Sequence, residues 1–151
     1  MLVLGQQKIA DSPYADRILL ANAPCEALPH PEKIFDGITI AFGIRNVVDR
    51  QQGLREMARV LKPGGKAVIL EFAEPLNGFF RHVYYFYFLR ILPWLGGLIS
   101  QRSAYQYLPD SVLEFPKRDV FSQMMEDAGF SDVHVYNLTG GIAAVHVGTR
   151  L

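Results

Sequence analysis

Residues 133–148 read VHVYNLTGGIAAVHVG, and this stretch decides which kind of sheet the chain builds. It contains two apolar, β-branched runs, residues 133–137 and 142–148, each of which is typical of a β-strand. Only residues 138–141 join the two runs, whereas a parallel crossover needs roughly a dozen residues or more. The two strands are therefore predicted to be antiparallel to each other.

Helix and strand patterns alternate through the rest of the chain. Short apolar runs bounded by turn residues predict buried strands, and apolar residues at helical spacing predict helices. This alternation predicts an α/β fold with a largely parallel sheet, to which the antiparallel pair is added at the end. The predicted strands cover residues 17–21, 35–42 and 66–72, and the predicted helices cover residues 2–9, 50–61 and 117–128.

The composition limits the class of protein. The chain has 151 residues, of which 50% are hydrophobic and 20% are charged, and this is enough for one domain with a buried core. Its 15 basic residues balance its 15 acidic residues, which excludes the positive surface expected of a nucleic-acid-binding protein. Cys25 is the single cysteine and the 4 histidines lack metal-ligand spacing, so we expect no disulfide and no metal site. The first residues lack the pattern of a secretory signal, and we expect a cytoplasmic protein.

Several short motifs together resemble one enzyme family. They are IAFGIRNV at residues 40–47, RVLKPGG at 59–65 followed by VILEF at 68–72, SAYQYL at 103–108, and YNLTGG at 136–141. The LKPGG turn is common among methyltransferases, whereas FGIRN and AYQYL in this order and spacing are far more specific. In this combination the chain resembles the menaquinone/ubiquinone biosynthesis C-methyltransferases of the UbiE type, along its whole length.

The resemblance implies a particular fold for residues 1–151. The family has the class I S-adenosylmethionine-dependent methyltransferase sheet, which is Rossmann-like, with strand order 3-2-1-4-5-7-6 and strand 7 antiparallel. Residues 17–21, 35–42 and 66–72 then match strands 3, 4 and 5, and the antiparallel pair matches strands 6 and 7. Strands 1 and 2 have no counterpart here, so we expect a single partial methyltransferase domain.

In the family, the two strands that are missing here carry the residues that bind the cofactor. A Gly-rich turn after strand 1 and an acidic residue at the end of strand 2 hold S-adenosylmethionine in the family. No strand in this sequence is followed by a G-x-G turn, and Gly140-Gly141 joins the antiparallel pair. By resemblance the chain is the C-terminal part of a longer enzyme. We therefore expect little binding of S-adenosylmethionine and little activity from this chain alone.

Arg45 is the residue that we expect to take part in the chemistry, together with Asn46. The resemblance implies methyl transfer from S-adenosylmethionine to a ring carbon of a prenylated quinol, either demethylmenaquinol or its ubiquinone-pathway equivalent. A guanidinium beside the quinol oxygen would stabilise the developing phenolate, or would orient a water that takes the proton. The alternative for Arg45 is a surface or helix-capping arginine. Asn46 orients Arg45 or caps the helix 50–61, and Asp49 is a second candidate for that cap.

Two groups of residues are expected to touch the cofactor. The resemblance places the adenine beside Asn22 and Ala23, or beside Pro24 and Cys25 if the loop is shifted by its two extra residues. Asn22 alternatively only caps its own loop through side-chain to backbone bonds. The second group lies near the methionine end of the cofactor, where a side-chain hydroxyl found in many relatives is missing and backbone contacts are left: Ala41, Phe42 and Gly43.

Tyr105, Tyr107 and Glu71 are the candidates for the substrate pocket. A tyrosine offers an apolar ring with one hydroxyl, which suits a quinol, although simple packing explains these tyrosines equally well. Glu71 ends a predicted strand at the carboxyl edge of the sheet, where ligands bind in this class of fold. It either lines the site or pairs with Lys66 or with an arginine. For His146 we expect packing in the core.

The aromatic segment 79–110 is the expected lid or substrate-binding part of the domain. Residues 79–99 do not predict a transmembrane helix, because Arg81, His82 and Arg90 lie within them and Pro93 interrupts them. One face of this segment should pack on the sheet. The remaining rings either cover a prenylated substrate or contact a membrane surface, and ordinary core packing is the third alternative.

The expected absence of strands 1 and 2 leaves residues 35–42 as an edge strand. Such an edge invites pairing with another chain. Three outcomes stay open: residues 17–21 collapse onto this strand, two copies pair through it, or a separate N-terminal piece supplies the missing strands. The alternative to an enzyme is a non-catalytic quinone-binding or scaffolding partner in a quinone-biosynthesis assembly.

Overall fold

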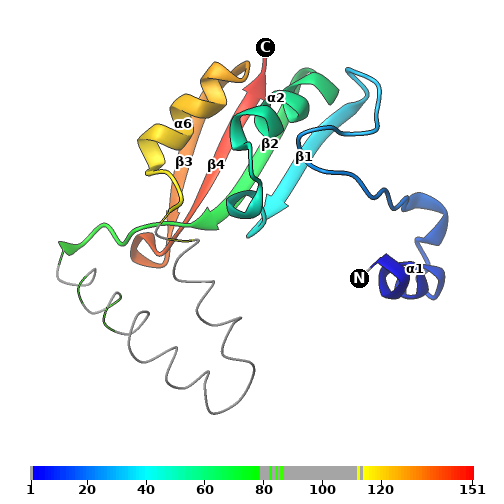
Figure 1. Ribbon diagram of the computed structural model, residues 1–151, viewed down its shortest axis with the longest axis horizontal. Helices are drawn as coiled ribbons and strands as arrows, with labels where there is room; N and C mark the ends of the chain where they lie inside the picture. The colour runs from blue at the N-terminus through cyan, green and yellow to red at the C-terminus, as the bar shows by residue number, and fades with distance from the viewer. Residues whose placement is uncertain (1, 79–81, 83, 85, 87–111, 113) are drawn as a thin grey trace.

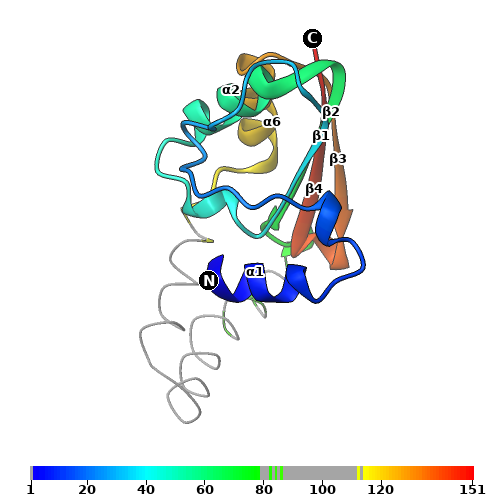
Figure 2. The same cartoon turned by 90° about the vertical axis from the view of Figure 1, so that its right-hand side faces the viewer.

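The computed structural model describes residues 2–78, 82, 84, 86, 112 and 114–151. Within this part of the chain, four strands form one sheet, and two helices cover the same face of it (Figures 1 and 2). A further helix, α1, lies apart from these two layers (Figure 1). The elements are α1 (Leu2–Ala10), β1 (Phe35–Ala41), α2 (Arg50–Val60), β2 (Leu61–Phe72), α6 (Arg118–Asp127), β3 (Phe130–Leu138) and β4 (Ala143–Arg150), with 3₁₀ helices at Ala15–Arg17, Ile44–Asn46 and Thr139–Gly141.

The strand order is β1-β2-β4-β3. β1 pairs with β2 in parallel, and β4 is antiparallel to both β2 and β3. The antiparallel pair predicted from the short connection is therefore confirmed. So is the order 4-5-7-6 that the family resemblance implied for these four strands.

The predicted strand at residues 17–21 is wrong. Arg17 ends a 3₁₀ helix, residues 18–24 have no regular structure, and the side chain of Leu19 is 98% exposed. A strand needs a hydrogen-bonding neighbour, and the described residues provide none for this segment. Its apolar sequence is typical of a buried strand, but none of the described strands lies next to it.

β2 begins earlier than its apolar run predicts, at Leu61 instead of Lys66. The register with β1 jumps from Phe35↔Leu61 to Gly37↔Lys66, so the Lys-Pro-Gly-Gly turn is carried as a bulge within the strand. Gly64 makes this bulge with a φ of +79°, a conformation that other residues rarely adopt. The turn therefore ends helix α2 and starts the strand without a separate loop.

The core lies between the sheet and helices α2 and α6. Asp49 starts α2 by accepting a hydrogen bond from the backbone N–H of Gln52 at 2.9 Å, so Asp49, and not Asn46, is the N-cap. Burying each large apolar side chain contributes roughly 1.5–3 kcal/mol, which makes this layer the main source of stability. The core cluster consists of Ile44, Leu54, Met57, Ala58, Leu61, Ala67, Ile69, Phe121, Met125 and Phe130.

β1 is an edge strand in the part of the chain that the structure describes. The backbone N–H of Phe42 donates to the carbonyl of Leu70 in β2 at 2.9 Å. By alternation, the backbone N–H and C=O groups of Ile38 and Ile40 also point toward β2. The N–H and C=O groups of Thr39 and Ala41, both exposed, then point toward the free edge. We propose that two copies of the chain pair through this edge.

A charge on this edge should block the pairing. In light scattering at micromolar concentration we expect the wild-type chain to be oligomeric, and Thr39→Lys to shift it toward the monomer, because a lysine on an edge strand disfavours edge-to-edge pairing. Gln6→Lys, on the exposed surface of α1, is the control and should change nothing. A monomeric wild-type chain with cooperative unfolding would contradict the proposal.

Candidate functional site

The candidate site lies where β1 and β2 end. β1 stops at Ala41, and Phe42 turns the chain sharply with a φ of +54° before the 3₁₀ helix Ile44–Asn46 begins. β2 ends beside it with Glu71 and Phe72. Because parallel strands direct their carboxyl ends to one edge, two distant motifs, FGIRN and LEF, meet there.

A buried ion pair joins these two motifs. Glu71 is only 1% exposed, and its Oε1 accepts a hydrogen bond from Arg45 Nη1 at 3.0 Å. The same carboxylate accepts from the backbone N–H of Arg45 at 3.3 Å and from that of Phe72 at 3.0 Å. Of the alternatives for Glu71, pairing with an arginine is the one observed, whereas Lys66 donates to Thr149.

The pairing leaves Arg45 with unused donors. Its side chain is 11% exposed, and one nitrogen, Nη1, serves Glu71 and also donates to the carbonyl of Phe42. Nε is buried and has no hydrogen-bond partner among the described residues. The guanidinium carbon lies 5.5 Å from the centre of the Phe72 ring, within range of a cation–π contact. Arg45 is thus an oriented cation with remaining donor capacity, not a solvated surface residue or a helix cap.

A second arginine, Arg50, belongs to the same cluster. Its Nη2 donates to the backbone carbonyl of Arg45 at 2.9 Å, and its guanidinium carbon lies 5.8 Å from the centre of the Phe115 ring. Our sequence reasoning missed this residue, because an arginine at the first position of a predicted helix is typical of a solvated surface. The only feature of the sequence that pointed to Arg50 is its position five residues after Arg45, at the start of the predicted helix.

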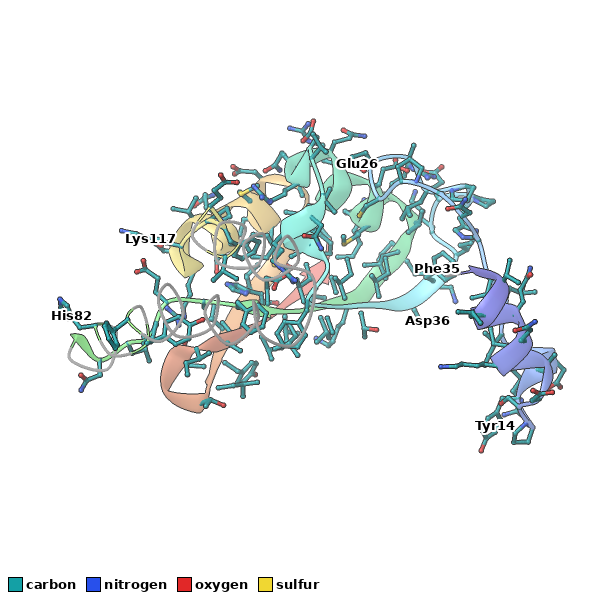
Figure 3. The ribbon with its side chains drawn as sticks, turned by 60° about the horizontal axis from the view of Figure 1, so that its bottom comes forward. Tyr14, Glu26, Phe35, Asp36, His82 and Lys117 are labelled. Atoms are coloured by element: carbon teal, nitrogen blue, oxygen red, sulfur yellow. The ribbon has the colours of Figure 1, made fainter. Side chains whose placement is uncertain are left out.

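A cleft of about 460 Å³ lies between the end of β2 and the start of α6. Phe72 and Phe115, the rings that the two guanidiniums approach, both line it. Figure 3 shows Lys117, which also lines the cleft, on the far side of the molecule from Phe35 and Asp36. The lining residues are Phe72, Ala73, Glu74, Val112, Phe115, Pro116, Lys117, Arg118 and Asp119.

Arg118 holds one wall of the cleft in place. Its Nη2 donates to the carbonyl of Glu74 at 2.6 Å and to that of Gly141 at 2.5 Å. It therefore ties the start of α6 to the chain leaving β2 and to the turn between β3 and β4. Behind it lies His146, which is 2% exposed and packs its ring edge-on against Phe121 at 4.9 Å. The expectation that His146 packs in the core is confirmed.

Burial should make the stability of the chain depend on His146 below neutral pH. Burial lowers the pKa of His146 from its ordinary 6.5, although its bond to the Arg118 carbonyl opposes this, and the Arg118 charge lowers it further. Below about pH 6.5 the unfolded chain binds a proton that the folded chain does not, so the folded state loses stability as the pH falls. We expect urea unfolding from pH 7.5 to 5.5 to show a smaller loss in His146→Phe than in wild type. Equal losses would contradict the prediction.

The residues expected near adenine lie in a loop that α2 holds. The backbone N–H of Leu28 donates to Glu56 at 2.8 Å, and Arg59 donates to the carbonyl of His30 at 2.8 Å. Asn22 is exposed and Ala23 is partly exposed, whereas the half-buried Cys25 packs against the core. Burial, and then the carboxylates of Glu26 and Glu56, raise the pKa of the Cys25 thiol. Contact of either pair with a cofactor stays a prediction.

Some predicted features lie outside the described residues. These are Tyr105, Tyr107 and most of the segment 79–110. Within the described ranges, no group of histidine, cysteine and carboxylate side chains is arranged to hold a metal ion. None of the helices described there is long and apolar enough to cross a bilayer.

Solved structures share this fold at low sequence identity. A SAM-dependent methyltransferase from Thermotoga maritima, described as a possible histamine N-methyltransferase, matches 96% of this chain and 70% of its own with a TM-score of 0.61 and 17% identity. A SAM-dependent methyltransferase from Aquifex aeolicus matches 88% of this chain and 55% of its own, with a TM-score of 0.58 and 16% identity. The chain therefore has the Rossmann-like fold of the class I S-adenosylmethionine-dependent methyltransferases, in truncated form.

Sequence comparison identifies the family. Residues 1–150 match the model of the ubiE/COQ5 methyltransferase family. The ubiquinone/menaquinone biosynthesis C-methyltransferase UbiE of Geobacter sulfurreducens is 58% identical over 150 residues, which are 99% of this chain and 59% of that protein. The chain belongs to the ubiE/COQ5 methyltransferase family, and it spans about three fifths of the length of this relative.

Proposed function

We propose that the chain is the acceptor-binding and catalytic-arginine part of a quinone-biosynthesis C-methyltransferase. Its relatives bear that activity in their names, and the buried Arg45–Glu71 pair at the ends of β1 and β2 is the observation that carries the proposal. The acceptor would be the ring of a prenylated quinol. Its ring would lie in the cleft between Phe72 and Phe115, whose apolar faces suit an aromatic ligand.

The role of Arg45 follows from its charge. A guanidinium stays protonated at physiological pH and cannot accept the quinol proton itself. It can donate its free N–H groups to the quinol oxygen and stabilise the phenolate that forms as a water takes the proton. The ring carbon next to the phenolate would then be the nucleophile for methyl transfer, in which a carbon–carbon bond would form as the carbon–sulfur bond of the methyl donor broke. Loss of the proton from that ring carbon restores the aromatic ring.

S-adenosylmethionine supplies the methyl group when it is bound. The turn at Phe42 and Gly43, with Phe42 38% exposed, would form one wall of its site, and the loop at Asn22 and Ala23 would form another. None of the described strands is followed by a G-x-G turn, and Gly140 and Gly141 only join β3 to the antiparallel β4, so these residues fit only part of the cofactor. We therefore propose that the chain alone binds S-adenosylmethionine more weakly than the micromolar range, and calorimetry showing micromolar binding would overturn this.

A split-enzyme experiment tests the function. The chain is produced together with the portion of the Geobacter sulfurreducens relative that it does not match. We expect methyl transfer from labelled S-adenosylmethionine to demethylmenaquinol only when both pieces are present. Arg45→Gln should reduce the rate by roughly 10²–10³-fold, as loss of a donor to a developing oxyanion does.

Two outcomes would count against this proposal. If Arg45→Gln left the rate unchanged, the arginine would not act on the quinol oxygen. If the associated pieces bound demethylmenaquinol and no methyl group were transferred, the non-catalytic binding role would be favoured. Arg55→Gln is the matched control, because Arg55 is an exposed arginine in helix α2.

A further inference from the structure

Arg50 makes two contacts that join the predicted catalytic arginine to the cleft. Toward the site, its Nη2 donates to the backbone carbonyl of Arg45 at 2.9 Å. Toward the cleft, its guanidinium lies 5.8 Å from the centre of the Phe115 ring, which lines the cleft and packs against Phe121 at 5.0 Å. The side chain therefore bridges two segments that are far apart in the chain.

Helix stability does not account for this placement. Arg50 is the first residue of α2, where the positive end of the helix dipole disfavours a cation. Asp49 already supplies the N-cap through its bond to Gln52 at 2.9 Å. The Nε of Arg50 is also buried and has no hydrogen-bond partner among the described residues, which is an unfavourable state for a charged group. A residue kept for local stability would avoid each of these costs.

Four hydrogen bonds within the described residues hold Arg45; Arg50 provides one of them, and Arg45 Nη1 donates another to the carbonyl of Phe42. Glu71 binds its guanidinium at 3.0 Å and its backbone N–H at 3.3 Å, and Arg50 binds its backbone carbonyl. Glu71 fixes the charge from the β2 side, whereas Arg50 fixes the peptide from the α2 side. With the carbonyl released, the 3₁₀ helix Ile44–Asn46 could shift and move the guanidinium away from the ring of Phe72, which lines the cleft.

We propose that Arg50 is a positioning residue, which orients the guanidinium of Arg45 toward an aromatic hydroxyl bound in the cleft. Through its contact with Phe115, it also couples that orientation to the position of the Phe115 ring. The inference rests on the proposed function of Arg45 and adds a residue to it. The ligand class is an aromatic alcohol that ionises to a phenolate. Arg50 itself does not touch the reacting atoms.

The probe for this proposal is 1-naphthol, which needs neither cofactor nor turnover. Its neutral and ionised forms have different absorption spectra, so its ionisation can be titrated while it is bound to the intact chain. In the wild type, a guanidinium near the hydroxyl should lower the pKa of bound 1-naphthol by about one unit or more relative to free probe. Arg45→Gln should abolish this shift.

Variants at position 50 separate positioning from packing. Arg50→Gln should lose at least half of the shift, while its dissociation constant for neutral 1-naphthol stays within about threefold of wild type. Arg50→Lys keeps the charge and should recover part of the shift. Circular dichroism and melting temperatures check folding, and Arg55→Gln, an exposed arginine on the same helix, should retain the full shift.

The outcomes distinguish this inference from the proposed function. A wild-type chain that binds 1-naphthol without a shift, or does not bind it, overturns both. A shift that Arg45→Gln abolishes and Arg50→Gln leaves intact overturns the role of Arg50 alone. A loss of stability in Arg50→Gln and Arg50→Lys with an unchanged shift shows a merely structural residue and also overturns it.

Discussion

Glu71→Leu is expected to lower the free energy of unfolding by about 3–5 kcal/mol, because it leaves the guanidinium of Arg45 buried without its counter-charge. The carboxylate is 1% exposed and accepts three hydrogen bonds, from Arg45 Nη1, from the Arg45 backbone N–H and from the Phe72 backbone N–H. Leucine fills a similar volume and replaces none of these acceptors. Urea unfolding followed by circular dichroism measures the loss.

The double variant tests whether the cost comes from the unpaired charge. When Arg45→Met is added to Glu71→Leu, both charges are gone, and most of the lost stability should return, because a buried ion pair contributes little against an apolar pair. The exposed pair between Lys62 and Asp36, at 2.6 Å with Asp36 85% exposed, is the matched comparison. Asp36→Asn should cost less than about 1 kcal/mol. A Glu71→Leu variant as stable as Asp36→Asn would refute the argument.

The Arg45–Glu71 pair also explains why the site needs both strands. A buried arginine is tolerated only with a buried acceptor, and the acceptor lies on β2 while the arginine follows β1. The parallel pairing of these strands, with Ala41 opposite Leu70, sets the register that brings them together. We infer that the orientation of Arg45 depends on the sheet more than on its own loop.

The sheet was predictable because its signals are local. The short link between β3 and β4 forces them antiparallel, and the apolar run of β1 needs only one neighbour. The same local reading failed at residues 17–21, whose apolar sequence is typical of a strand although no partner strand is described for it. Strand formation depends on a neighbour that the run itself does not reveal.

The site was predictable only in part, for a similar reason. Motif resemblance selected Arg45 and placed Glu71 at the correct edge, but the choice between Lys66 and an arginine as its partner depends on how side chains alternate across the sheet. Arg50 carries no motif, and among the described residues its hydrogen bond goes to a backbone carbonyl, which any residue at position 45 would present. Contacts to the backbone leave no pattern of residue types in a sequence.

Gly141→Ala is expected to destabilise the chain by roughly 2–5 kcal/mol, since it adds backbone strain and a steric clash at one position. Gly141 has a φ of +95°, in the region that favours glycine. A Cβ there would lie 2.9 Å from the backbone N and from Cγ of Leu76, and 2.9 Å from Arg118 Nη2. Because the backbone nitrogen of Leu76 donates to Gly140 at 3.1 Å, the strand exit cannot move aside without breaking that bond.

Gly64→Ala separates the two contributions. Gly64 has a φ of +79°, but a Cβ there would meet nothing within 4 Å, so this variant measures strain alone, at about 1–2 kcal/mol. The excess loss in Gly141→Ala then measures the close approach of Leu76 and Arg118. If this excess loss of stability is observed, the hydrogen bonds from Arg118 to Glu74 and Gly141 must be weakened in Gly141→Ala. Hydrogen exchange at the Leu76 amide should then be faster in Gly141→Ala and unchanged in Gly64→Ala. Equal stability losses in the two variants would show that this wall of the cleft is not tightly packed against the β3–β4 turn.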